Sequence, residues 1–260
     1  MTLLEQTIKN KSPVLYNEIQ KEVLFFQKKY VGARDSVLQD DIFRLIDDLE
    51  GVDLLIFPIE DDELCGFLCE YKGQMFIYIN SYLPYDKQIF AAAHELYHYL
   101  EKHNRELLRP KSLEENNVDR AENKANLFAA LLLVPEESLM KELSLLNVKS
   151  GRDLDELKII KLMDTFAVPL KTIILRLYEI DILSEYEAKR WLTVPDRDSE
   201  KGILKQIKKH KIAERWQKRT RQIKYSNLKF LIIDNDELEL LSRQKIEKDL
   251  AFIKQDDGNE

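Results

Sequence analysis

Residues that interrupt or crosslink a chain are scarce in this sequence. Its 260 residues include seven glycines, seven prolines and two cysteines. So few chain breakers predict a mainly helical fold with simple loops. The two cysteines exclude the disulfide-rich class of small secreted proteins. Cys65 and Cys69 share a strand-like segment, where their spacing holds the sulfurs too far apart for an easy disulfide, so we expect reduced thiols.

Long apolar runs are also missing. No window approaches the roughly 18 consecutive apolar residues of a membrane span, and the first residues lack the apolar core of a signal peptide. We therefore expect a cytoplasmic protein with no membrane contact. An apolar fraction of 44% and a charged fraction of 33% are typical of a globular chain, long enough for one large domain or two small ones.

Positive charge is concentrated in one segment of an otherwise acidic chain. The net charge is −7, yet residues 201–229 hold 11 Lys and Arg against one Glu. Residues 230–260 hold four Lys and Arg against nine Asp and Glu. Such a basic segment between acidic ones predicts an electrostatic contact, either within the molecule or with an acidic partner.

Periodicity of the apolar residues predicts an α+β fold with a small antiparallel sheet ahead of a histidine-containing helix. The expected strands are 52–59, two strands flanking a turn at Lys72-Gly73, and 230–233 near the end of the chain. The expected helices lie at 13–30, 36–49, 85–102, 118–133, a pair over 153–180 broken at Val168-Pro169, and a basic helical region over 184–230.

Histidine is scarce too, and its placement is uneven. Three of the four histidines fall in "FAAAHELYHYLEKH", residues 90–103. His94 and His98 are one helical turn apart, a spacing that lets two imidazoles bind a single Zn²⁺. In such HExxH sites the glutamate, here Glu95, is the general base for the water that attacks the substrate. A helix with surface histidines is the plainer alternative, but the alanine-rich and aromatic neighbours indicate a buried helix.

A catalytic zinc needs a third protein ligand. No glycine lies between His98 and His103, so the longer metzincin pattern is absent. The helix over 118–133 offers Asp119 and Glu122. We favour Glu122, because Asn126 one turn later can hydrogen-bond a ligand and Asp119 fits a solvated helix start.

These segments resemble the ImmA/IrrE family of bacterial and phage metallopeptidases. That family combines an HExxH helix with a second helix of the form E-x-x-A-N-x-F-A-x-x-L-L-x-P. This chain matches the second helix, with one extra residue before the proline, at Glu122, Ala125, Asn126, Phe128, Ala129, Leu132 or Leu133, and Pro135. The resemblance covers about residues 14–140. It extends more weakly over 153–183 to a helix-turn-helix-like segment, with Pro169 where the family often has a capping serine.

The resemblance implies a zincin-like metallopeptidase domain at 1–145 and a helix-turn-helix-like segment at 150–195. Residues 196–260 lie outside the resemblance, and their composition predicts a charged extension. It implies that His94, His98 and Glu122 bind Zn²⁺ and that Glu95 activates water. The implied function is endoproteolysis of a helix-turn-helix repressor, which relieves repression of a mobile element or stress operon. No residue is assigned as hydrogen-bond donor to the transition state; the candidates are Tyr97, Tyr99 and His103.

Two alternatives remain open at this stage. The chain could bind a repressor and remodel it without cleaving a peptide bond, since the presence of Glu95 shows that catalysis is possible and not that it occurs. It could also bind DNA. Nucleic acid is not favoured, because the second helix of the 153–180 pair offers only Lys171 and Arg176 as cations, fewer polar side chains than groove-reading helices usually carry. We expect this pair to serve substrate recognition instead.

Overall fold

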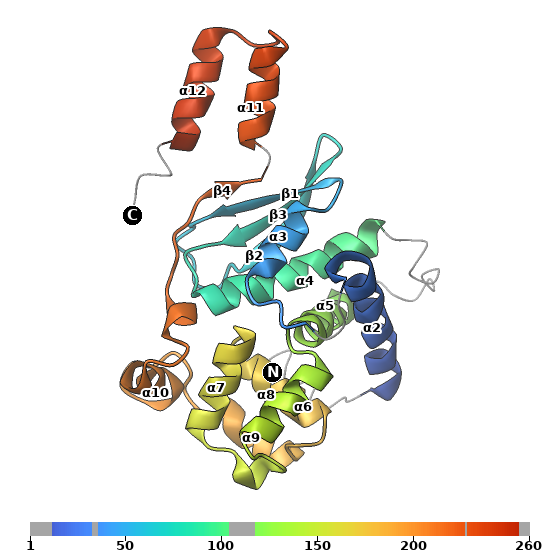
Figure 1. The fold of residues 1–260 in the computed structure, drawn as a ribbon, viewed down its shortest axis with the longest axis vertical. Helices are drawn as coiled ribbons and strands as arrows, with labels where there is room; N and C mark the ends of the chain where they lie inside the picture. The colour runs from blue at the N-terminus through green and yellow to red at the C-terminus, as the bar shows by residue number, and fades with distance from the viewer. Residues whose placement is uncertain (1–11, 33–35, 104–117, 227, 255–260) are drawn as a thin grey trace.

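A small sheet lies on a layer of helices in the computed structural model, which describes residues 12–32, 36–103, 118–226 and 228–254 (Figure 1). The sheet has four strands in the order β2-β3-β1-β4. Their bounds are β1 Val52–Phe57, β2 Gly66–Tyr71, β3 Gln74–Asn80 and β4 Lys224–Tyr225.

The sheet is mixed, so the prediction of an antiparallel sheet was wrong in part. Strands β2 and β3 form the expected antiparallel hairpin, in which both turn residues, Lys72 and Gly73, have positive φ. Strand β3, however, pairs parallel to β1. Because β3 is the most buried of the strands, it takes a central place, while the more exposed β2 lies at the edge. Alternating polarity along β2 and β3 could not reveal this order.

Helices α3 (Asp41–Asp47) and α4 (Tyr85–His103) pack on the sheet, and α5 (Val118–Leu133) packs on α4. Helix α2 (Pro13–Phe26), which continues into a π-helical turn (Gln27–Val31), covers α5. Apolar side chains of the sheet and of these helices, among them Leu54, Ile77, Leu96 and Phe128, are fully buried between the layers. No helix in the described ranges has the length and apolar character needed to span a bilayer.

A second group of helices follows: α6 (Glu136–Leu145), a short 3₁₀ turn (Gly151–Asp153), α7 (Glu156–Phe166), α8 (Leu170–Glu179) and α9 (Glu185–Leu192). Pro169 is the N-cap of α8, one position earlier than the N1 position at which proline is most readily accommodated. Seven of the ten α8 residues are buried, including Arg176 at 0% exposure. Helix α8 therefore has no broad solvent-facing surface that could enter a DNA groove.

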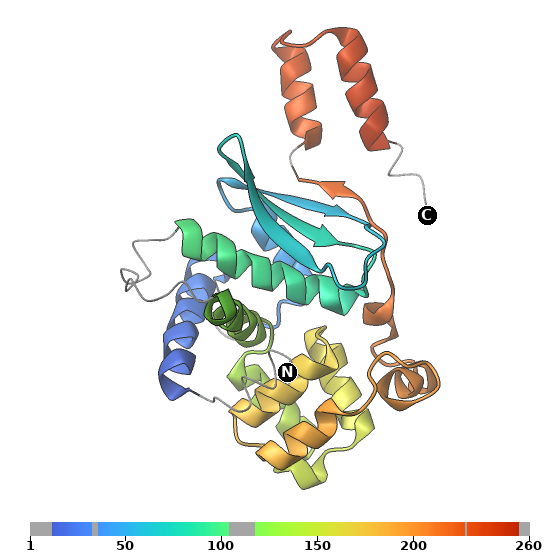
Figure 2. The ribbon, with the colours of Figure 1, turned by 180° about the vertical axis from the view of Figure 1, so that it is seen from behind.

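The end of the chain returns to the sheet and then projects from it. Helix α10 (Gly202–His210) and a 3₁₀ turn (Glu214–Gln217) lead to β4, which pairs with β1. Helices α11 (Leu228–Glu237) and α12 (Arg243–Lys254) then form a hairpin that stands apart from the body in both views (Figures 1 and 2). The predicted strand at 230–233 was wrong, because a short apolar run fits a helix packed against α12 equally well.

The segment 196–226 is fastened to the start of α4. The Asp86 carboxylate is fully buried in α4, at 0% exposure. It accepts hydrogen bonds from Arg197 Nη2 at 2.9 and 3.0 Å and from Gln217 Nε2 at 3.0 Å. The Trp216 ring stacks on Tyr85 with centroids 5.8 Å apart. Within the basic segment 201–229, Arg219 pairs with Asp62 and Lys224 pairs with Asp47, so the electrostatic contact predicted for this segment is at least partly intramolecular.

Between α2 and α5, burial and the nearby Glu18 and Glu101 raise the pKa of Glu22 to about 7, against the opposing effect of Lys124. The folded state thus keeps a proton that the unfolded chain has already released, and stability from this group is lost as pH rises through about 7. We expect Glu22→Gln to stabilise the protein at about pH 8.5 by on the order of 1 kcal/mol and to have little effect near pH 4. Denaturant unfolding of both proteins across this pH range measures the difference in their free energies of unfolding. A difference that does not change with pH would contradict the raised pKa.

Candidate metal centre and substrate cleft

The two histidines of α4 meet Glu122 of α5. Each imidazole Nε2 lies 3.2 Å from a different Glu122 oxygen, and the two Nε2 atoms are 3.1 Å apart. One ligand atom from each residue falls within 4.8 Å of the others. No other group of three or more such side chains is found within the described ranges. Two imidazole nitrogens and one carboxylate oxygen are the donor set of many catalytic zinc sites, which keep a fourth position open.

Asn126 holds one of these histidines in place. Its Oδ1 lies 3.1 Å from His94 Nδ1, which therefore carries the proton and leaves Nε2 free to bind a metal. The sequence predicted a supporting role for Asn126 but paired it with Glu122. The contact is instead with His94, because α5 crosses α4 closely enough to bring Asn126 against the imidazole.

The pKa shifts of Glu122 and His98 favour the charges that a cation requires. The close contact with the His94 imidazole lowers the pKa of Glu122, against the effect of partial burial. Burial and the neighbouring His94 lower the pKa of His98. An ionised carboxylate and neutral imidazoles are the forms that bind metal ions.

Glu95 follows His94 and is only 8% exposed. Burial raises the pKa of Glu95, and the nearby Glu122 adds to this, while His94 and a hydrogen bond from the Leu68 backbone act in the opposite direction. A raised pKa makes a carboxylate a stronger base. Glu95 is therefore suited to accept a proton at a site where water and a metal would meet.

A cleft of about 660 Å³ contains His94, Glu95 and Glu122. One wall is α4 and another is α5. The remaining walls come from the loop before β2, from the start of α8, and from Asp196 and Arg197. The sequence assigned substrate recognition to the 153–180 helix pair but identified none of these lining residues, because only the tertiary fold brings residues 169–175 and 196–197 next to the HExxH helix.

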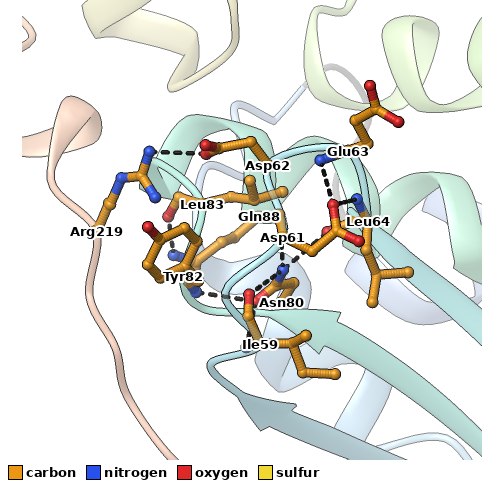
Figure 3. A network of polar contacts seen from close by, with 10 residues as sticks. All are labelled: Ile59, Asp61, Asp62, Glu63, Leu64, Asn80, Tyr82, Leu83, Gln88 and Arg219. Atoms are coloured by element: carbon orange, nitrogen blue, oxygen red, sulfur yellow. Dashed lines mark hydrogen bonds and ion pairs between the residues drawn. The ribbon is translucent and has the colours of Figure 1, made fainter.

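The loop before β2 forms the rim of the cleft at Glu63, Leu64 and Cys65, and the buried Asn80 holds this loop in place (Figure 3). Asn80 accepts hydrogen bonds from the backbone N–H groups of Ile59 and Tyr82 and donates from Nδ2 toward three loop carbonyls at 2.9–3.1 Å. On the same loop, Asp62 Oδ1 lies 2.7 Å from Arg219 Nη2 (Figure 3). The only sequence signal for this role was a polar residue ending the apolar strand "QMFIYIN".

Gly66 allows this rim to approach α4. A Cβ atom at this position would lie 2.7 Å from the Tyr78 carbonyl oxygen and 3.3 Å from Glu95 Cγ. Gly66→Ala should therefore push β2 away from Glu95 and lower the hydrolytic activity expected of this site by about tenfold or more, while leaving bound metal unchanged. Activity and metal content of the purified variant test this. Full activity would show that β2 can shift without disturbing the site.

The other candidates from the sequence lie elsewhere or outside the description. Tyr97 and Tyr99 are buried in the core, at 2% and 6% exposure, and neither lines the cleft. The Tyr99 hydroxyl donates to the Glu50 carbonyl at 2.6 Å. The side chains of His103 and Asp119 lie outside the described residues. Glu122 is thus the third ligand candidate that the structure brings to the histidines.

Comparison with known proteins agrees with this geometry. A family model described as the IrrE N-terminal-like domain, Peptidase_M78, matches residues 48–178, about half of the chain. Comparison with curated proteins found no match. The matched range includes the candidate metal centre and extends through most of α8. The chain therefore belongs to the IrrE N-terminal-like family of peptidases.

Proposed function

We propose that the protein is a zinc-dependent endopeptidase that cleaves a helix-turn-helix transcriptional repressor and so relieves repression of a mobile element or stress operon. The observation that carries the catalytic part is the convergence of His94, His98 and Glu122 within 4.8 Å, with Glu95 in the same cleft. Membership of a peptidase family supports the reaction class.

In this proposal His94, His98 and Glu122 hold the zinc ion, which when bound would polarise the scissile carbonyl. Glu95 accepts a proton from the attacking water and then passes it to the leaving amine. Asn126 keeps His94 in the tautomer that presents Nε2 to the site. Strand β2 ends the sheet beside the cleft, so an extended peptide could pair with its outer edge.

The proposal of a repressor substrate rests on the family resemblance and on the position of α8. Helix α8 contributes its first turn to the cleft and buries most of its remaining surface, including Arg176. This arrangement supports a role in receiving a protein substrate more than a role in reading DNA bases.

A nucleic-acid- or repressor-binding regulator that acts without hydrolysis is the second candidate. Its support is α10, where Lys205, Lys208 and Lys209 are exposed on one helical face. Lysines of this kind can bind phosphate backbones without sequence selectivity. Binding to duplex DNA that weakens steeply with added salt, with no peptide cleavage, would favour this candidate.

New protein termini test the proposed function. Zinc-loaded protein is incubated with a lysate of the cells in which it is naturally made. New N-termini are identified by mass spectrometry, with Glu95→Gln as the control. We expect cuts in a helix-turn-helix repressor with the parent only. Termini that appear equally with Glu95→Gln, or relief of repression retained by that variant in cells, would contradict peptidase action.

A further inference from the structure

The first turn of α8 faces the substrate cleft without a side-chain cap. Pro169 is the N-cap residue, and no side chain accepts a hydrogen bond from the start of this ten-residue helix. Pro169, Lys171, Thr172 and Leu175 all line the cleft that contains the candidate metal centre. Amide groups at an uncapped helix start carry partial positive charge and attract anions.

Thr172 supplies an independent indication of a ligand. Its side chain lines the cleft although the residue is only 4% exposed. Its hydroxyl makes no hydrogen bond to another protein group within the part of the chain that the structure describes, and it is not among the fully buried polar atoms without a partner, so it opens to the cleft. A ligand oxygen in the cleft can therefore form a hydrogen bond with it.

Two lysines add full positive charge to the same cleft. Lys171 is exposed at the start of α8, and Lys87 is half-buried on α4. Neither forms an ion pair within the described ranges. Arg197, the third cation of the lining, differs because Asp86 already binds its guanidinium at 2.9 Å.

The four carboxylates that line the cleft are not paired with Lys171 or Lys87. Glu95 and Glu122 belong to the candidate metal centre, and Asp196 lies 3.9 Å from Arg197 Nε. Glu63 is exposed at the rim. Between α8 and α4 the surface is apolar, with Phe90 and Leu175. If a peptide places a carboxylate at the start of α8, an apolar residue next to that carboxylate in the peptide would contact Phe90 and Leu175.

We propose that the start of α8, with Thr172 and Lys171 and with Lys87 on the facing wall, is a carboxylate subsite of the substrate cleft. The inference rests on the proposed peptidase function and adds a substrate class: peptides that present a carboxylate at a fixed distance from the cleaved bond. The carboxylate comes from an Asp or Glu side chain or from the free C-terminus of the peptide.

Peptide mixtures with and without free carboxylates test the subsite. A synthetic mixture of diverse sequence is prepared with free and with amidated C-termini, and cut sites of the zinc-loaded protein are identified by mass spectrometry. An internal acidic residue at one position relative to the cut, in both mixtures, assigns the subsite to side chains. Cuts at a constant distance from the end, in the free form only, assign it to the C-terminal carboxylate.

Three variants separate the subsite from the rest of the cleft. Thr172→Val removes the hydroxyl and keeps a similar shape, and Lys171→Glu reverses the charge at an exposed position. Lys161→Glu, on the exposed face of α7 outside the cleft, is the matched control. We expect the preference for a carboxylate to fall by about tenfold in each of the first two variants and to persist in the control.

A binding measurement distinguishes failure of the subsite from failure of the proposed function. Glu95→Gln protein, with and without zinc, is mixed with the same peptides, and those retained on size-exclusion filtration are identified. Enrichment of carboxylate peptides, lost in Thr172→Val and Lys171→Glu, supports the subsite even if the parent cuts nothing, in which case only the peptidase function fails. Cutting or binding without carboxylate preference, or a preference unchanged by both substitutions, overturns the subsite.

Discussion

A chain that ends at residue 195 is expected to fail to fold cooperatively. Removing residues 196–260 takes away Arg197 and leaves the Asp86 carboxylate, which is 0% exposed, without its charged partner. Breaking a buried ion pair in this way costs about 3–5 kcal/mol. The truncation also removes the buried Trp216 and the β4 pairing along β1. Together these losses are comparable to the whole stability of a typical domain, about 5–15 kcal/mol.

A chain that ends at Ser226 is the matched control. It keeps the ion pair, Trp216 and β4, and of the described residues it loses only the hairpin of α11 and α12, whose main contacts are with each other. Unfolding followed by circular dichroism should show a cooperative transition for this chain and none for the shorter one. Similar midpoints for both would show that residues 196–226 are a separable extension, as the division into 1–145, 150–195 and 196–260 implies.

Glu95→Gln is expected to reduce peptide cleavage by about 10² to 10⁴-fold, the range that general-base catalysis contributes. Glutamine keeps the size of the side chain but cannot accept the proton. Since Glu95 is not among the three converging side chains, metal content should be unchanged. Rates on a peptide cut by the parent, measured beside metal content, test both parts.

A carboxylate further along the same helix provides the comparison for this variant. Glu101 lies near the end of α4, outside the cleft, and Glu101→Gln should retain the parent rate. Loss of metal in Glu95→Gln would instead make Glu95 a ligand. A rate within a few-fold of the parent would exclude it as the base.

The sequence pointed to the residues that converge in the candidate site and missed the contacts made by tertiary packing. His94 and His98 are fixed by helical spacing alone, and the second helix motif pointed to Glu122. Asp86 looked like an ordinary acidic residue in the first turn of a helix. Its burial depends on Arg197, which is more than one hundred residues away in the chain. No local pattern encodes such a pair.

The fold shows the same division between local and distant effects. The bounds of α4 and α5 followed closely from periodicity and from Pro135 after the second helix. The parallel pairing of β1 with β3 depends on which strand the helices bury most deeply, which the sequence does not state directly. The helix at 228–237, expected as a strand, depends on whether a short apolar run finds a strand or a helix as its neighbour.

Metal content tests the central claim most directly. The zinc content of protein purified without chelators is measured by inductively coupled plasma mass spectrometry. The same measurement is made on His98→Ala, on Glu122→Ala and on the exposed controls His210→Ala and Glu185→Ala. The three-ligand site predicts about one zinc per chain in the parent and in both controls, and loss of zinc in the first two variants. No zinc in the parent even after it is supplied, or zinc retained in both ligand variants, would contradict a metal centre formed by these side chains.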